Sequence, residues 1–234
     1  MDKMKSIILA SGFGTRLYPL TTDQPKCLLE YKGKPIISHM VDKIPEQVDI
    51  LVNTNKKFEA DFRKWQKTLD REITLCVEPV FSPEQIFGAL GSLHYWVTKT
   101  NITDDLMVLA GDNYFEFNLT NFISSYDRKN TLVAVCDIGD RFKARQLGVV
   151  QLDGHKIVRF DEKPDEPKST LVATACYLLP TRVFPLLSDF VRKGEFDNLG
   201  SFIAYLTNVD EVHAYVFAEL WFDIGSIDTY YSTR

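Results

Sequence analysis

The chain has 234 residues, of which 45% are apolar and 25% are charged, with a formal net charge of −5 at pH 7. This balance is typical of a soluble globular protein with one large α/β domain or two small ones, and it excludes a disordered chain. The acidic charge argues against a general nucleic-acid binder. No apolar run reaches the ~18 residues of a membrane span, and the start MDKMKSIILASG is typical of a first strand, not a signal peptide.

The cysteines and histidines indicate no metal or disulfide framework. The four cysteines show no C-x-x-C spacing, and the four histidines are scattered without metal-ligand spacing. We therefore expect buried free thiols in a reducing cytoplasm, and no zinc site.

Strand and helix patterns alternate through the first part of the chain. Strands are predicted at residues 4–10, 48–52, 73–77, 106–110 and 131–137. Helices are predicted after Lys34–Pro35, around Phe58, Phe62, Trp65 and Leu69, and over 83–97 and 119–126. This alternation predicts an α/β fold with a Rossmann-like, mostly parallel sheet and helices on both faces.

The pattern changes in the second part. Segments 147–152 and 156–160 flank Asp153–Gly154, which predicts a hairpin. A strand over 171–179, helices over 181–191 and 198–206, and a last strand over 213–217 follow. We expect one domain over residues 1–234, in which the half 139–234 has more antiparallel pairing than the half 1–138.

The stretch Ile7–Lys26 joins an apolar strand to a glycine-bearing turn, followed by Arg16 and Lys26. Such a turn can wrap a phosphate chain with its backbone N–H groups, while Arg and Lys supply positive charge. The Walker A pattern G-x-x-x-x-G-K-[ST] is absent from this stretch, and the dinucleotide fingerprint G-x-G-x-x-G does not fit because its third glycine would fall on Leu17. For the glycines alone, an ordinary tight turn is the simpler interpretation.

The longer string LASGFGTRLYPLT, with PKCLLEYKGKPII after it, resembles the signature of the sugar-phosphate nucleotidyltransferases, such as the glucose-1-phosphate thymidylyl- and uridylyltransferases. It departs from the signature at Ser11, where the family usually has Gly or Ala. The resemblance implies a nucleotide-diphospho-sugar transferase fold, with the nucleotide on half 1–138 and the sugar phosphate on half 139–234. The implied nucleotide-binding residues are Leu9, Ala10, Ser11, Gly12, Gly14, Thr15, Arg16, Lys26, Gln85, Gly88 and Asp112.

Two aspartates complete the implied site. Gly111-Asp112-Asn113 follows a strand and resembles the family's metal-binding motif, and Trp221-Phe222-Asp223-Ile224-Gly225-Ser226 resembles its second acidic motif. Each aspartate could instead cap a turn or a helix. Because Mg²⁺ favours one or two carboxylates together with phosphate oxygens, the resemblance implies a Mg²⁺ ion on Asp112 and Asp223.

The acceptor side rests on three further matches. Leu147-Gly148-Val149-Val150 resembles a family motif whose glycine meets the sugar, and Glu162-Lys163-Pro164 matches one that holds the sugar and its phosphate. Tyr177 falls where the family keeps a tyrosine near that phosphate. Leu147 and Ala175 depart from the family's aromatic residue and glycine. The implied acceptor residues are Gly148, Glu162, Lys163 and Tyr177, and Arg16, Lys26 and Lys163 are the implied catalytic cations.

The largest departure from the family signature lies in the loop that contacts the nucleotide base in the family. Gly88, Ala89 and Leu90 match, but Gln85 and Phe87 replace small residues, and Gln85 either bonds a pyrimidine edge or is simply exposed. We expect a cytoplasmic enzyme of nucleotide-sugar biosynthesis that joins UTP or dTTP to a sugar 1-phosphate and releases pyrophosphate.

Two alternatives stay open. One is a cytidylyltransferase of the same fold that acts on phosphocholine or inositol phosphate, and the other is an inactive nucleotide-sugar-binding module. No nucleic-acid or membrane partner and no fused acyltransferase half are expected, and assembly into a homo-oligomer stays open.

Overall fold

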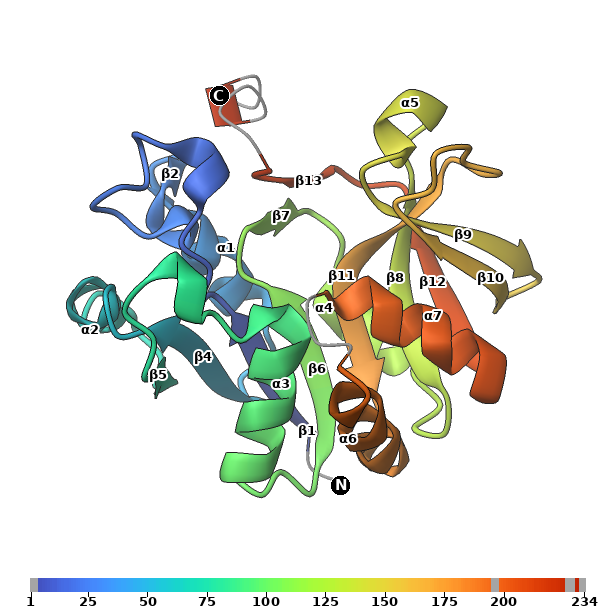
Figure 1. Ribbon diagram of the computed structural model, residues 1–234, viewed down its shortest axis with the longest axis horizontal. Helices are drawn as coiled ribbons and strands as arrows, with labels where there is room; N and C mark the ends of the chain where they lie inside the picture. The colour runs from blue at the N-terminus through green and yellow to red at the C-terminus, as the bar shows by residue number, and fades with distance from the viewer. Residues whose placement is uncertain (1–3, 195–197, 226–229, 232–234) are drawn as a thin grey trace.

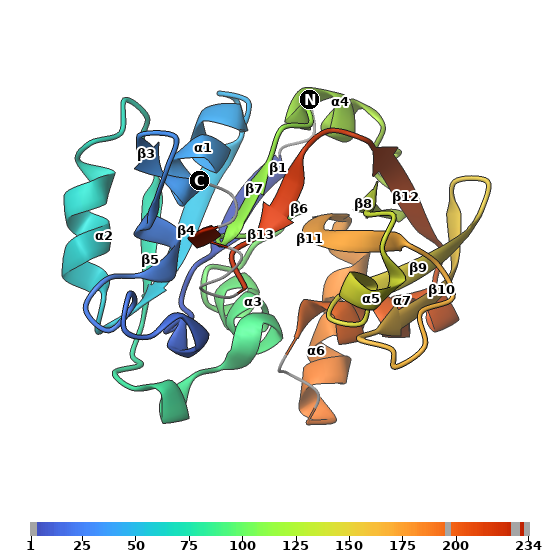
Figure 2. The same ribbon diagram turned by 90° about the horizontal axis from the view of Figure 1, so that it is seen from above.

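A computed structural model describes residues 4–194, 198–225 and 230–231. In these residues a sheet of nine strands runs through the whole molecule in the order β5-β4-β1-β6-β11-β8-β12-β10-β9 (Figures 1 and 2). Helices pack against both faces, which confirms the predicted fold class.

Four parallel strands form the first half of the sheet. They are β1 (Met4–Leu9), β4 (Asp49–Asn55), β5 (Thr74–Glu78) and β6 (Asp105–Ala110). In the register, Leu9 lies beside both Asn53 of β4 and Ala110 of β6. The carboxyl ends of these strands therefore meet at one edge, where open α/β sheets bind their ligands.

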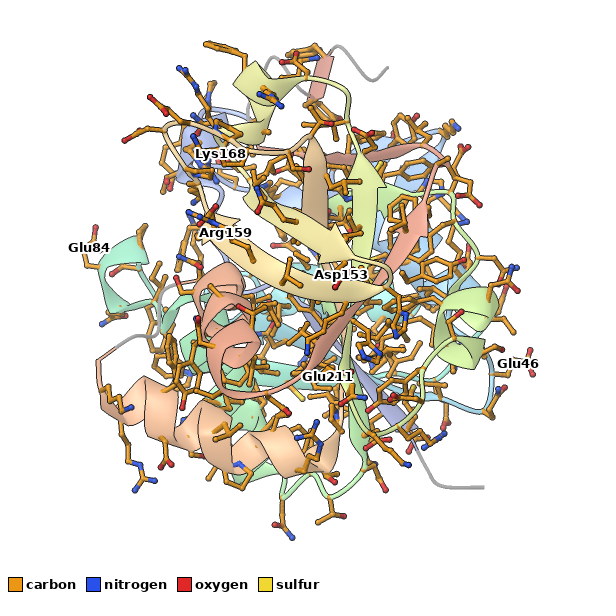
Figure 3. The ribbon with its side chains drawn as sticks, turned by 90° about the vertical axis from the view of Figure 1, so that its right-hand side faces the viewer. Glu46, Glu84, Asp153, Arg159, Lys168 and Glu211 are labelled. Carbon is orange, nitrogen blue, oxygen red and sulfur yellow. The ribbon has the colours of Figure 1, made fainter. Side chains whose placement is uncertain are left out.

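The second half is mixed, as the sequence predicts. Strand β11 (Leu171–Leu179) runs antiparallel to β6 and to β8 (Thr131–Asp137), and β12 (Val212–Phe217) runs parallel to β8. The hairpin of β9 (Gly148–Asp153) and β10 (Lys156–Glu162) closes the far edge. Figure 3 shows Asp153 and Arg159 on this hairpin.

Alternating side chains of the central strands face two separate cores. Ile8 packs in a core with α1 (Ile36–Lys43), α2 (Glu59–Gln66) and α4 (Leu119–Ser124). Its neighbour Ile7 packs in a core with α3 (Gly88–Lys99), α6 (Phe184–Arg192) and α7 (Leu199–Val209). This alternation is the strand period of two, and it explains why both faces of the sheet carry helices.

Several short elements sit at the ligand edge. The 3₁₀ turns η1 (Thr15–Leu17) and η2 (Lys26–Leu28) follow β1, and β2 (Glu30–Tyr31) pairs with β3 (Lys34–Pro35). Strand β7 (Asn113–Phe115) pairs with β13 (Trp221–Asp223). Three further short elements complete the described secondary structure, wherever they lie in the fold. They are η3 (Pro83–Gln85), α5 (Arg141–Ala144) and η4 (Thr181–Val183).

Two sequence predictions about elements are wrong. The helix predicted over 83–97 is divided into η3 and α3, because Gly88 has a φ of +72°, a left-handed conformation that an α-helix cannot continue through. The strand at 213–217 is not the last, since β13 follows it. Among the described residues, no helix is long and apolar enough to span a membrane.

Candidate active site

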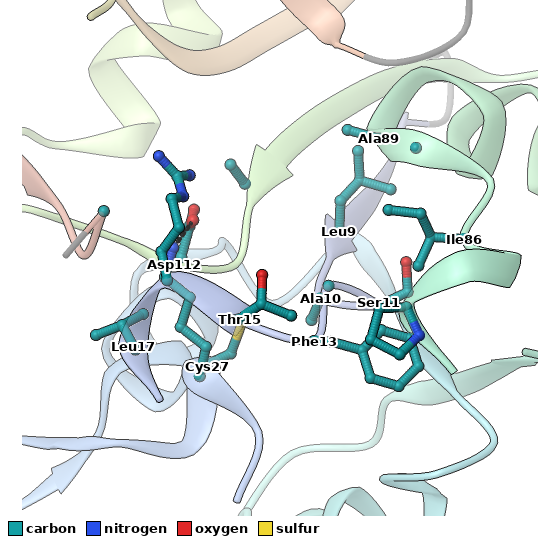
Figure 4. Close-up of a pocket in the computed structure, with 18 of the residues that line it drawn as sticks. Leu9, Ala10, Ser11, Phe13, Thr15, Leu17, Cys27, Ile86, Ala89 and Asp112 are labelled. Atoms are coloured by element: carbon teal, nitrogen blue, oxygen red, sulfur yellow. Dashed lines mark hydrogen bonds and ion pairs between the residues drawn. The ribbon is translucent and has the colours of Figure 1, made fainter. Parts of the chain in front are cut away.

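A hollow of about 350 Å³ opens at the carboxyl edge of β1 and β6 (Figure 4). Every residue in the predicted nucleotide-binding set except Gln85 lines it. The other lining residues are Phe13, Leu17, Cys27, Pro83, Ile86, Ala89, Ala110, Leu199 and Gly225.

The glycine turn forms one wall of this hollow. Gly14 has a left-handed φ of +65° and is the N-cap of η1, and the Thr21 hydroxyl donates a 2.7 Å hydrogen bond to the Gly14 carbonyl. Thr15 and Arg16 follow on the exposed side of η1. The turn therefore presents backbone and a guanidinium to the hollow, a combination suited to phosphate oxygens.

Lys26 and Asp112 meet across the hollow. The Lys26 Nζ atom lies 2.5 Å from the Asp112 Oδ2 atom, and the Lys26 residue is only 9% exposed. Burial alone would raise the pKa of Asp112, but the charge and hydrogen bond of Lys26 outweigh it, so that the pKa lies below its ordinary value. Asp112 is thus held as a carboxylate.

Asp223 is brought to the same place by the pairing of β13 with β7. It lies opposite Asn113, and the Ile224 N–H donates a 2.9 Å hydrogen bond to the Asp112 carbonyl. The Trp221 indole N–H donates to the Asn113 side-chain oxygen at 2.7 Å, which fixes the two strands together. Ser226, the end of this motif, lies outside the described residues.

The surroundings of Asp223 shift its pKa in the direction opposite to the shift of Asp112. Burial and the nearby negative charge of Asp112 raise the pKa of Asp223, and Lys26 and Arg16 offset this only in part. Two neighbouring carboxylates with opposite pKa shifts are a common feature of functional sites.

These two carboxylates fit a divalent cation. In the described residues no group of three or more His, Cys, Asp or Glu side chains gathers at one point, so a site made wholly of such side chains is not formed. Mg²⁺, however, is usually held by one or two carboxylates with water and phosphate oxygens. Burial, and after it the charge of Asp112, disfavours the ionised form of Asp223, and a cation there would offset both.

A second hollow of about 250 Å³ adjoins the first. Gly148, Glu162, Lys163, Tyr177 and Asp223 all line it. The two hollows share four lining residues, which are Ala89, Ala110, Asp112 and Leu199. The cleft is therefore continuous, with Asp112 at the junction.

Glu162 is the polar centre of the second hollow. Burial raises its pKa, while Lys163, whose Nζ atom lies 3.9 Å from Glu162 Oε1, lowers it in part. The carboxylate packs against Gly200 at the start of α7, where a Cβ atom would overlap it. Tyr177 is 3% exposed, and burial raises the pKa of its hydroxyl, so the group stays protonated.

Gln85 lies apart from the other predicted residues. Its side chain is exposed and accepts a 2.9 Å hydrogen bond from the Phe81 N–H, and it does not line the first hollow. Its neighbours Pro83 and Ile86 line the hollow in its place.

Sequence reasoning missed a buried polar cluster beneath the glycine turn. Asn53 accepts from the Ala10 N–H and donates to Ser11 and to Glu78, and Trp96 donates to the same Glu78 oxygen. Asn53 and Glu78 are 0% and 1% exposed. Their position at the carboxyl ends of β4 and β5 was the available signal. Gly200 and Asn198, which line the second hollow, were also missed.

The comparisons with known proteins agree with this geometry. The family model described as nucleotidyl transferase matches residues 5–234. The bifunctional protein GlmU of Methanococcus maripaludis is 31% identical over 95% of this chain, and the match spans 51% of that protein. This chain thus spans about half the length of that relative and of several others.

A second relative and a solved structure match over more of their own length. The UTP–glucose-1-phosphate uridylyltransferase AglF of Haloferax volcanii is 32% identical over 77% of this chain and 74% of that protein. A Bacillus anthracis structure assigned as a glucose-1-phosphate thymidylyltransferase, solved with sucrose, superimposes with a TM-score of 0.86 and 25% identity over 98% of this chain and 93% of that one. The chain therefore belongs to the family of sugar-phosphate nucleotidyl transferases.

Proposed function

We propose that this protein transfers a nucleotidyl group from a nucleoside triphosphate to a sugar 1-phosphate. The observation that carries the proposal is the continuous cleft, in which the glycine turn and the Glu162–Lys163 pair lie on either side of Asp112. An oxygen of the sugar phosphate attacks the α-phosphorus of the nucleoside triphosphate and forms a new bond to it. The bond from the α-phosphorus to the β-phosphate oxygen breaks, and pyrophosphate leaves with that electron pair.

Charge neutralisation is the main task of such a site. Two unit charges ~4 Å apart repel by about 4 kcal/mol at an effective dielectric constant near 20, and two anionic substrates bring several such pairs. Arg16 would hold the β- and γ-phosphates, and Lys163 would hold the acceptor phosphate. Lys26 would lie between the α-phosphate and the attacking oxygen, and it acts by position and charge because no covalent intermediate is needed.

Asp112 and Asp223 would hold a Mg²⁺ ion, which supplies further positive charge for the phosphate oxygens. The ion pair between Lys26 and Asp112 keeps Asp112 ionised and therefore able to bind the ion. The acceptor would contact Gly148, Glu162 and Tyr177, with the Glu162 carboxylate accepting from sugar hydroxyls.

The sheet supports assignment of the whole chain to one domain. It runs without interruption from β5 to β9. In our proposal the nucleotide would bind to half 1–138 and the sugar phosphate to half 139–234. UTP or dTTP is the favoured nucleotide, because the named relatives include a uridylyltransferase and a thymidylyltransferase. The product would then be a nucleotide sugar made in the cytoplasm.

A pyrophosphate-release assay tests the proposal. The purified chain is incubated with Mg²⁺, each of UTP, dTTP, CTP, GTP and ATP in turn, and each of three acceptors: glucose 1-phosphate, phosphocholine and inositol phosphate. Release that requires the sugar phosphate supports the proposal, and mass spectrometry identifies the product. Pyrophosphate release only with phosphocholine or inositol phosphate would favour the cytidylyltransferase alternative over the proposal. Nucleotide binding without any pyrophosphate release would favour the inactive binding module.

A further inference from the structure

The first hollow has two chemically different ends. Figure 4 shows Asp112, Leu17 and Cys27 on one side and Ser11, Ile86 and Ala89 on the other. The Asp112 end holds the cation Lys26, whereas the other end is lined by apolar side chains, including Ile86, which is 48% exposed, and Pro83. Under the proposed function, the triphosphate occupies the charged end, and the nucleobase, whose flat ring faces are only weakly polar, occupies the other.

The Ser11 hydroxyl is a polar side-chain group at this apolar end. Ser11 also departs from the family signature, in which Gly or Ala is usual and no hydroxyl is present. Its backbone carbonyl accepts a 2.8 Å hydrogen bond from the Asn55 amide, which fixes the position of the residue. The hydroxyl is therefore a feature of this chain and is held at the place where a base would lie.

The buried cluster determines which hydrogen-bond role this hydroxyl can take. The Ala10 N–H donates to Asn53 Oδ1 at 2.6 Å, so the other end of that amide, Nδ2, must be a donor. Asn53 Nδ2 lies 2.7 Å from Glu78 Oε1 and 3.2 Å from Ser11 Oγ. Ser11 Oγ thus accepts from Asn53, and its own proton remains available for donation.

In the described part of the chain, the only other hydrogen-bond partner of this oxygen is Ser92 Oγ, at 3.3 Å. Ser92 is a hydroxyl that is 1% exposed, and it can itself donate to the remaining lone pair of Ser11. A ligand can therefore take the Ser11 proton without leaving a buried group unpaired.

We propose that Ser11 is a specificity-determining residue that donates a hydrogen bond to a carbonyl oxygen of the nucleobase. The inference rests on the proposed function for the placement of the base. Uracil and thymine carry such carbonyl groups and adenine carries none, so the geometry favours UTP or dTTP over ATP. A site that donates to a substrate acceptor discriminates against an analogue without it.

Equilibrium binding tests the assignment without relying on turnover. The Kd values of UTP, dTTP, ATP and inorganic tripolyphosphate are measured for the wild-type chain, Ser11→Ala and Ser92→Ala. We expect Ser11→Ala to weaken UTP and dTTP binding by about three- to tenfold, the range of one hydrogen bond. ATP and tripolyphosphate binding should change by less than about twofold, because neither presents a base carbonyl. Ser92→Ala should leave UTP binding no weaker than wild type.

Three results would overturn the assignment. These are unchanged UTP binding in Ser11→Ala, an equal loss for tripolyphosphate or ATP, and wild-type binding of ATP at least as tight as of UTP and dTTP. Ala is one of the two residues usual in the family signature at this position, so the variant should fold, and a thermal melt checks it. A wild-type chain that binds UTP selectively but releases no pyrophosphate would defeat the proposed function and leave the Ser11 assignment standing.

Discussion

The Lys26 ammonium nitrogen lies 2.5 Å from the Asp112 carboxylate, although 86 positions separate the two residues in the sequence. The pair lies at the junction of two hollows, one lined by the glycine turn and the other by Glu162 and Lys163. Lys26 therefore stabilises the charged form of a carboxylate and also provides a cation at the point where two anionic substrates would meet.

Replacement of Lys26 by Ala should lower kcat severely, by roughly 100-fold or more, the scale of one preorganised charge. Nucleotide affinity should fall only modestly, since Arg16 and the glycine turn remain. Steady-state pyrophosphate release and the Kd of UTP measure the two effects separately. Lys64→Ala, an exposed position on α2, is the matched control and should behave as wild type. Near-normal turnover of Lys26→Ala would show that the cation is not needed.

Replacement of Asp223 by Asn should abolish turnover but stabilise the metal-free protein. The folded-state pKa of Asp223 is raised, so its charged form destabilises the fold at every pH above that pKa. We expect the melting temperature in EDTA at pH 8 to rise by roughly 2–4 °C, which corresponds to about 1 kcal/mol for a chain of this size.

This difference should shrink with acidification. As the pH falls through the raised pKa toward the ordinary aspartate value of about 3.9, Asp223 becomes protonated in the wild type and the penalty disappears. Thermal melts at pH 8 and pH 4.5 check the trend, with exposed Asp165→Asn as the control. A lower melting temperature for Asp223→Asn at pH 8 would contradict the account.

Replacement of Gly200 by Ala should weaken binding of the acceptor. A Cβ atom at this position would overlap the Glu162 carboxylate, which must then move out of the second hollow. We expect the KM for the sugar phosphate to rise about tenfold or more, the loss of one charged hydrogen bond, while the KM for UTP stays constant. Glu162→Gln should give a similar rise, and the double variant should be no worse than either. If the increases in KM of the two single variants added up in the double variant, Gly200 would not act through Glu162.

Replacement of Ala175 by Gly should stabilise the protein. Ala175 has a φ of +52° at the irregular register of β11, a left-handed conformation that is strained for Ala and free for Gly. We expect a gain of roughly 0.5–1 kcal/mol in the free energy of unfolding, measured by denaturant titration. Ala173→Gly in the same strand, where Ala is buried, is the control and should destabilise. A loss for Ala175→Gly would show that the strain is compensated locally.

Long, strongly patterned elements could be predicted from the sequence. The strands at Thr131–Asp137 and Leu171–Leu179 have the predicted bounds, because predominantly apolar runs between turn residues specify a buried strand locally. Short pairs such as β2–β3 and β7–β13 could not be predicted. Their pairing depends on which distant segment lies beside them, and two or three residues carry too little periodicity.

In the candidate site, too, the residues in local motifs could be predicted and the contacts between distant segments could not. The glycine turn, Asp112 and Glu162 lie at strand ends that the motifs identified, and the fold brings them into one cleft. Asn53 and Glu78 act on the glycine turn through hydrogen bonds between separate strands, which no local pattern reveals. The side-chain direction of Gln85 is likewise determined by its contact with the Phe81 N–H.

The most direct test of the account is the position of a divalent ion. Crystals grown with Mn²⁺ and UTP, measured at the manganese absorption edge, should show one strong anomalous peak between the Asp112 and Asp223 carboxylates. The same experiment with Asp223→Asn should show a much weaker peak there. A manganese peak remote from both aspartates, or one of full strength in the variant, would contradict the claim that these two residues hold the ion.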